Sequence, residues 1–430
     1  MRKIRLSKSI RLLLSLTLFI GVSASTALAG KGTLTLWEWH MTEIPDIVGP
    51  LYQKFEQEHD VKLLIDSPPF GDLPKKFMIA GEAGQLPDLG ELWAAMLVPE
   101  FAEKGFLEPL DPYIEKEGGA KFLAKFQPWS ITYYKGKIYS LPIFAGNIGL
   151  FYNKTMFKNA GIGAPPKTWD ELVEVSKKLT NPAKHEYGLA LNGGDEELLL
   201  CLTPFIAQNG GRVGRVGGKL WINSPETVGA IQFVIDLVNK HKVVPSYVTT
   251  PYRVARELFR TGKAAMLYDG SWSIKFVEEK NPTFEWGTAV LPKGKTTGTG
   301  VSIGDTEFGM FRSCKDKELG WEFLKFITSD ESNYFWLSRT LILPANKATW
   351  PKIQDQPYLK PFLDQMNLPN AIDVYRELPP QVPQALEVFK VEMHNAVLKK
   401  KTAQAAMDAV ADEWNKLYKE WEKRYGSYTR

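Results

Sequence analysis

The chain has 430 residues, of which 44% are hydrophobic and 24% are charged, so we expect a globular protein of two ordinary domains. The formal net charge is +4, but the first 29 residues hold five basic side chains and no acidic one. The remainder therefore carries 48 basic and 49 acidic groups. A near-neutral chain with two cysteines argues against a nucleic-acid binder and excludes disulfide scaffolds and four-cysteine metal sites.

The N-terminus has the pattern of an export signal. Basic residues precede an apolar run over 12–22, and small residues follow, ending in Ala27-Leu28-Ala29. The run is too short to span a bilayer as a helix. The sequence therefore predicts a signal peptide over 1–29, with Gly30 starting the mature protein. No cysteine lies near this site for lipid attachment, so we expect a periplasmic protein. We also expect a monomer.

The first part of the mature chain alternates strand and helix patterns. Strands are predicted over 33–36, 61–65 and from 87, and helices over 44–55 and 73–82. This order predicts a parallel sheet covered by helices, in which ligands bind at the carboxyl ends of the strands. The loops after the first and third strands carry Trp37, Glu38, Trp39 and Trp93.

Later segments are also regular. An extended run over 139–152 is expected to be broken at Gly146-Asn147, and 264–268 is expected to be a strand followed by a turn over 269–272. Helices are predicted to start after Thr168 and over 226–238, 254–259 and 319–327. A seam of apolar residues over 403–421 predicts a helix packed on the body of the protein.

Four stretches together resemble the extracellular solute-binding proteins of family 1, the group of maltose-binding protein. They are 84–89 (GQLPDL), 136–156 (GKIYSLPIFAGNIGLFYNKTM), 259–272 (FRTGKAAMLYDGSW) and 321–329 (WEFLKFITS). The resemblance implies an α/β, two-lobed periplasmic binding protein fold. Each lobe would be a mostly parallel sheet flanked by helices, with a ligand cleft between the lobes. Such proteins deliver a small molecule to the permease subunits of an ABC importer.

The family pattern also implies where the chain crosses between the lobes. Crossings are expected near Gly146-Asn147, near 300–305 and near Leu343-Pro344. The first lobe would comprise 30–145 plus 303–343, and the second 146–302 plus 344–430. Cys201 and Cys314 would then lie in different lobes, so we expect two free thiols.

Sugars present flat apolar faces that aromatic rings cover and hydroxyls that carboxylates or amides bind. The resemblance implies that Trp272 stacks on a sugar, whereas Trp39, which alternates with Trp37, is expected in the core. The resemblance places Gly146-Asn147 where maltose-binding proteins carry a glutamate, so that hydroxyl contact is absent or altered here. The predicted ligand-binding residues are Trp37, Glu38, Trp93, Asn147, Asp269, Trp272 and Asp305.

Other functions stay open. A polyamine or a glycerol phosphate could replace the carbohydrate, although acids and aromatics at the strand ends favour a neutral or cationic polyhydroxy ligand. An exported glycan hydrolase would need carboxylate pairs such as Glu196 with Glu197 or Asp269 with Glu307. The G-x-S-x-G pattern over 300–304 is followed by an extended segment, which favours a hinge strand over a hydrolase elbow. The five histidines are scattered, so we expect no metal site. We also expect no catalytic residue and no cofactor.

Overall fold

The computed structural model describes residues 32–430 except 196, 280–281, 296–299, 367–369 and 429–430. The predicted signal peptide lies outside this range. Among the residues that the structure describes, no helix has both the length and the apolar character needed to cross a membrane.

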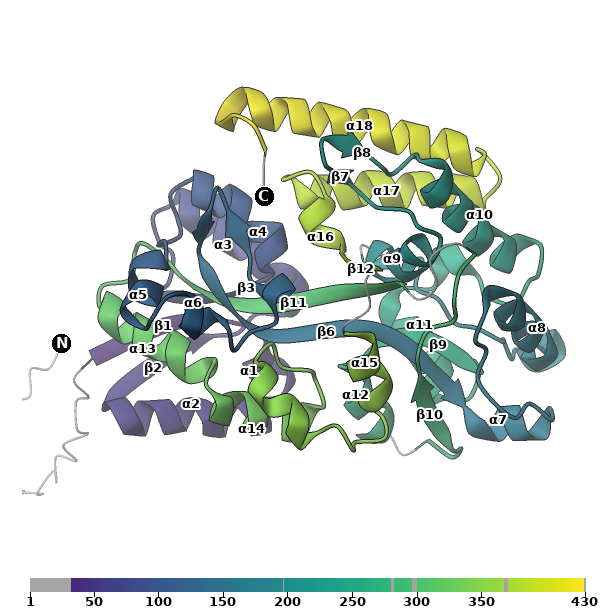
Figure 1. Ribbon diagram of the computed structural model, residues 1–430, viewed down its shortest axis with the longest axis horizontal. Helices are drawn as coiled ribbons and strands as arrows, with labels where there is room; N and C mark the ends of the chain where they lie inside the picture. The colour runs from purple at the N-terminus through teal and green to yellow at the C-terminus, as the bar shows by residue number, and fades with distance from the viewer. Residues whose placement is uncertain (1–31, 196, 280–281, 296–299, 367–369, 429–430) are drawn as a thin grey trace, which may run out of the picture.

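The first lobe is built on three parallel strands. β1 (Gly32–Trp37) lies between β2 (Val61–Asp66) and β3 (Leu89–Leu92), as the alternating pattern predicts. Leu34 and Leu36 of β1 are fully buried under α2 (Pro45–His59) and α13 (Lys317–Ile327). α3 (Leu73–Glu82) and α4 (Ala94–Glu103) lie on the opposite side of these strands (Figure 1). The remaining elements of this half are α1 (His40–Glu43), α5 (Asp111–Lys116), α6 (Ala120–Leu123), β4 (Tyr133–Tyr134), β5 (Lys137–Ile138) and α14 (Asp330–Thr340).

Two long strands join the halves of the molecule. β6 (Ser140–Asn153) and β11 (Gly300–Met310) run across its middle and pair antiparallel over 140–147 and 303–309 (Figure 1). β11 also pairs with β3, and beyond residue 147 β6 takes partners in the second half. A third segment runs beside them, because the N–H of Ala145 donates to the carbonyl of Leu343 at 2.9 Å.

The sheet of the second lobe is mixed rather than mostly parallel. Its strands β9 (Met266–Gly270) and β10 (Trp286–Ala289) both run antiparallel to β6, whereas β12 (Asn370–Asp373) runs parallel to β11. The resemblance alone did not reveal that β6 enters this lobe antiparallel to β9 and β10. The flanking helices are α7 (Lys154–Asn159), α8 (Trp169–Leu179), α10 (Pro225–Asn239), α11 (Tyr252–Arg260), α12 (Ser273–Glu279) and α15 (Lys360–Gln365).

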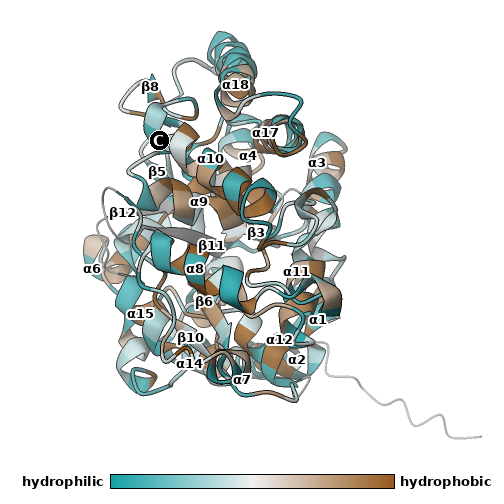
Figure 2. Cartoon of the chain, turned by 90° about the vertical axis from the view of Figure 1, so that its right-hand side faces the viewer, coloured by the Kyte–Doolittle hydropathy of each residue, from teal (hydrophilic) through white to brown (hydrophobic). Residues whose placement is uncertain are grey.

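α9 (Leu198–Gln208) forms the centre of the second lobe. Every residue of α9 is buried, including Cys201, and Figure 2 shows this strongly apolar helix surrounded by amphipathic ones. The glycine-rich segment after it forms a hairpin of β7 (Arg215–Val216) and β8 (Lys219–Leu220), with Gly217 and Gly218 at positive φ. It does not lead into a helix as a phosphate-binding loop would.

The predicted C-terminal helix is confirmed. α18 (Ala403–Tyr425) packs along α17 (Val382–Val397), and the short α16 (Val374–Glu377) precedes the pair. Trp414, Tyr418 and Trp421 are buried, and Nε1 of Trp414 donates to the carbonyl of Ala385 at 3.0 Å. The seam therefore packs against the protein body.

Two expectations about strand ends are wrong. The expected break at Gly146-Asn147 does not occur, because β6 pairs with β11 up to Asn147 and with β9 from Ile148. The side chain of Asn147 is also bonded: its amide donates to the carbonyl of Phe362 at 2.9 Å and its oxygen accepts from Gln365 at 3.1 Å. The turn predicted over 269–272 begins later, since Asp269 and Gly270 belong to β9 and pair with Gly149 and Ile148.

Candidate functional site

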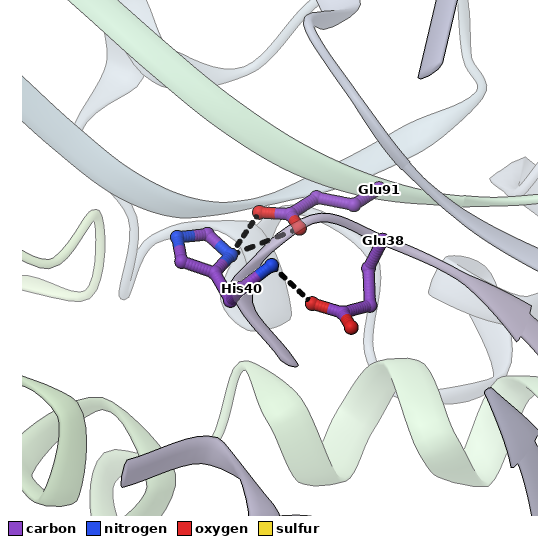
Figure 3. A group of neighbouring side chains, drawn as sticks. All are labelled: Glu38, His40 and Glu91. Carbon is purple, nitrogen blue, oxygen red and sulfur yellow. Dashed lines mark hydrogen bonds and ion pairs between the residues drawn. The ribbon is translucent and has the colours of Figure 1, made fainter. Parts of the chain in front are cut away.

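The carboxyl ends of β1 and β3 bring two acids and a histidine together. Nδ1 of His40 lies 2.9 Å from each carboxylate oxygen of Glu91. The carboxylate of Glu38 accepts the backbone N–H of His40 at 2.6 Å and that of Met41 at 3.1 Å, which fixes the start of α1. Figure 3 shows both carboxylates turned toward His40. Glu38 was a predicted site residue, whereas Glu91 and His40 were not.

This group is electrostatically unusual. Burial, with Glu91 close by, raises the pKa of Glu38 to about 7. Burial also raises the pKa of Glu91 well above its usual range and lowers that of His40 to about 4. The cause is the same for all three, since desolvation opposes the charged form of each group.

The tryptophans of the first loop have different environments. Trp39 is 7% exposed, which confirms it as a core residue. Trp37 is half-buried, with its ring stacked on Phe77 at 5.5 Å and Nζ of Lys76 4.2 Å from its centroid. Trp37 thus already has protein partners for its ring.

Trp93 follows β3 and meets a residue from the second lobe. Its half-buried ring lies 5.0 Å from the buried ring of Tyr375 in α16, tilted by 45°. Sequence reasoning missed Tyr375, because nothing in the pattern around it placed it opposite β3.

Asp269 is the centre of a buried hydrogen-bond network. It accepts from Nε of Arg256 at 2.9 Å, from the hydroxyl of Ser273 at 2.7 Å and from the hydroxyl of Tyr252. The Tyr252 hydroxyl in turn accepts a hydrogen bond from Nε1 of Trp272. Asp269 therefore positions Trp272 through Tyr252. The spacing of Tyr252 and Arg256, four residues apart in α11, places them on one helix face, but only the fold reveals their partner.

Trp272 is half-buried at the point where β6 crosses between the lobes. A Cβ atom built on Gly146 would lie 2.6 Å from Cζ3 of the indole. Asn147, the next residue, is fully buried and bonded within the second lobe, as described above. Asn147, Asp269 and Trp272 thus lie together around the junction of β6 and β9.

β6 connects this group to the acidic one. The ring of Phe144 lies 5.6 Å from that of His40, and Gly146, two residues on, contacts Trp272. Across the lobes, an arginine of α11, Arg253, approaches Glu43 of α1 to 3.8 Å.

Asp305 pairs with Ala145 through its backbone, but its side chain lies outside the described residues.

Comparisons with known proteins identify the family of this chain. The family model for bacterial extracellular solute-binding proteins matches residues 40–334. A putative binding protein of Brucella abortus (strain 2308) is 27% identical over 329 residues, covering 75% of this chain and 78% of its own. A maltotriose-binding protein of Pyrococcus abyssi is 29% identical over 320 residues, covering 70% and 63%.

The fold is also shared with solved structures. An ABC transporter solute-binding protein of Thermotoga lettingae, bound with α-D-tagatose, superposes with a TM-score of 0.80 at 27% identity. The match covers 90% of this chain and 99% of that one. Together, the two-lobed fold and the family match show that this chain belongs to the bacterial extracellular solute-binding proteins, a family of non-catalytic ABC transporter components.

Proposed function

We propose that this protein binds a carbohydrate between its lobes and delivers it to the permease subunits of an ABC importer. The observation that carries the proposal is the position of Trp272. Its half-buried indole is held by Tyr252 at one edge and lies against Gly146 on the crossing strand. An aromatic ring at a junction between lobes suits the apolar face of a sugar.

The other expected site residues are assigned two kinds of role. Trp93 is half-buried and, packed against the buried Tyr375 from the opposite lobe, would itself offer a second aromatic surface. Glu38, Asn147 and Asp269 are fully buried with partners in the protein, so they would act by positioning their neighbours. Names of relatives that mention maltotriose and tagatose support the carbohydrate class.

We also propose the lobe boundaries given above, 30–145 plus 303–343 and 146–302 plus 344–430. These boundaries are supported by three neighbouring segments, at Gly146, at 303–305 and at Leu343. A backbone rotation within these segments would move the strands of one lobe relative to those of the other. Cleavage of the signal peptide before Gly30 would leave the mature protein in the periplasm.

A thermal-unfolding screen of the mature protein tests the ligand class. Sugars, oligosaccharides including maltotriose, polyols, polyamines and glycerol phosphates would each be added after unfolding and refolding the protein to remove bound ligand. At 100 times its Kd a ligand stabilises by about 2.7 kcal/mol, enough for a shift of several degrees.

The expected result is a shift with one carbohydrate class that Trp272→Ala abolishes. The matched control is Trp221→Ala, which removes a half-buried tryptophan next to the β7–β8 hairpin and should keep the shift. A shift with polyamines or glycerol phosphates alone would contradict the carbohydrate assignment while keeping the binding function.

A further inference from the structure

The group Glu38, His40 and Glu91 has the composition of a metal site. One potential ligand atom from each residue lies within 4.8 Å of the others, and all three side chains are buried. Within the described residues, neither carboxylate forms an ion pair with a lysine or an arginine; the side chain that contacts Glu91 is the imidazole of His40, whose lowered pKa keeps it neutral at pH 7. Glu91 contacts the imidazole of His40, whereas Glu38 accepts the backbone N–H groups of His40 and Met41. Buried charges are normally paired or bound to a metal.

Two polar atoms at this group have no hydrogen-bond partner among the described residues. The hydroxyl of Tyr52, on α2, is one of them, and this side chain is 2% exposed. Glu38 and Glu91 both act on this hydroxyl through their charges, and Glu38 is also within its hydrogen-bonding reach, which places Tyr52 beside them. The second is Oε1 of Glu91, which accepts no hydrogen bond although Nδ1 lies 2.9 Å away. Buried polar atoms rarely stay unsatisfied, so a missing partner is indicated.

We propose that Glu38, His40 and Glu91 bind a divalent transition-metal cation of the Zn²⁺ or Mn²⁺ class, with Tyr52 beside it. Carboxylate oxygens and an imidazole nitrogen suit these ions, and no thiolate is present that would favour a softer one. Two carboxylates and a divalent cation give a neutral buried group. For Nδ1 to coordinate, the imidazole carries its proton on Nε2.

The position of the site gives it a structural role. It would tie the end of β1, the end of β3 and the start of α1 to one ion. Trp37 and Trp93 lie next to these ligands along the chain, so the ion would hold both loops that face the second lobe. Because the ligands are buried, the ion would enter as the chain folds, and the inference does not depend on which solute the protein binds.

Metal content tests this on the whole mature protein. The chain, purified without chelators and then unfolded with EDTA and refolded metal-free, would be titrated with ZnCl₂ or MnCl₂ alone. We expect elemental mass spectrometry to find one equivalent of bound metal per chain. The melting temperature should rise by several degrees. Co²⁺ should give visible absorption bands typical of a nitrogen and oxygen ligand set. Less than a tenth of an equivalent of every ion, with an unchanged melting temperature, would overturn the proposal.

Variants locate the site. Glu91→Gln and His40→Gln should each reduce binding at least tenfold and remove the Co²⁺ bands. The control is His185→Asn, at an exposed residue with φ of 52°, a conformation that asparagine accepts; it should bind as the unmodified protein does. Undiminished binding by Glu91→Gln would place the ion elsewhere and contradict the proposal. If a variant fails to fold, the stoichiometry and the Co²⁺ spectrum of the unmodified protein still decide.

Discussion

The indole of Trp272 lies against Gly146, so close that a Cβ atom at Gly146 would fall 2.6 Å from Cζ3 of the ring. Gly146 sits in β6 opposite Gly304 of β11, within the pair of strands that joins the lobes. The proposed sugar-stacking residue therefore contacts the strand on which lobe closure would depend.

Gly146→Ala should both destabilise the protein and weaken ligand binding. The added methyl group overlaps an aromatic ring, and overpacking of this kind costs about 1–3 kcal/mol. Urea unfolding and ligand titration would measure the two effects. Gly163→Ala is the control, because Gly163 is exposed and a Cβ atom there would have no neighbour within 4 Å; an equal effect at Gly163 would contradict the steric explanation.

Asp269→Asn should cost roughly 3 kcal/mol of stability, because it leaves the largely buried guanidinium of Arg256 without its counter-charge. It should also weaken ligand binding, since Asp269 positions Trp272 through Tyr252. Denaturant unfolding and calorimetric titration would measure both. Asp364→Asn removes an exposed partner of Lys360 and should cost under about 1 kcal/mol. Unchanged stability of Asp269→Asn would show that the network is not needed.

Glu307 should make the protein less stable as the pH rises from about 4.5 to 7. Burial raises its pKa to about 7, although Arg376 opposes this and Thr132 and Ser140 donate hydrogen bonds to it. Asp373 adds to the rise. Because the folded-state pKa lies above the unfolded value, the unfolded chain ionises first and is favoured across this window, and the loss is complete above pH 7.

Urea midpoints at several pH values would show this contribution. Glu307→Gln should weaken the pH dependence between 4.5 and 7 relative to the unmodified protein; a remainder is expected from Glu38 and Glu197, whose pKa burial also raises to about 7. Glu318→Gln, at an exposed residue paired with Lys116, should leave it unchanged. Identical pH profiles for the unmodified protein and Glu307→Gln would show that this carboxyl does not titrate in the window.

Export should produce a mature chain that begins at Gly30. The five basic residues and the Ala27-Leu28-Ala29 site predict one cleavage in a Gram-negative host. Intact-mass measurement of the periplasmic fraction would identify the new N-terminus. Ala29→Leu should slow cleavage, because the site requires a small residue, and an uncleaved membrane-bound chain from the unmodified gene would contradict the prediction.

The sequence predicted much of the fold, because its local signals are strong. Helix α3 begins and ends at the predicted residues, and the side chain of Thr168 caps α8 by accepting the N–H of Glu171 at 3.2 Å. β6 was harder. Gly146-Asn147 looks like a break, but β6 pairs with β11 up to Asn147 and with β9 from Ile148, so the strand continues through both residues.

The site was less predictable for a similar reason. Glu38 and Trp93 stood at recognisable strand ends, but their partners Glu91 and Tyr375 had no such signal. Glu91 lies inside β3, at a position that reads as core, and Tyr375 comes from a part of the chain nearly 300 residues away. Contacts of this range depend on how the lobes pack, which periodicity does not encode.

The most direct test of the central claim is the distance between the lobes with and without sugar. Spin labels on Lys75→Cys in α3 and Lys178→Cys in α8 sit on exposed positions of opposite lobes, while both native cysteines are buried. Labels on Lys178→Cys and Lys240→Cys, within the second lobe, provide the control. With the carbohydrate found in the screen, pulsed electron paramagnetic resonance should show the first distance shift by several ångströms and the second stay fixed. An unchanged first distance at saturating sugar would contradict closure of the lobes on a carbohydrate.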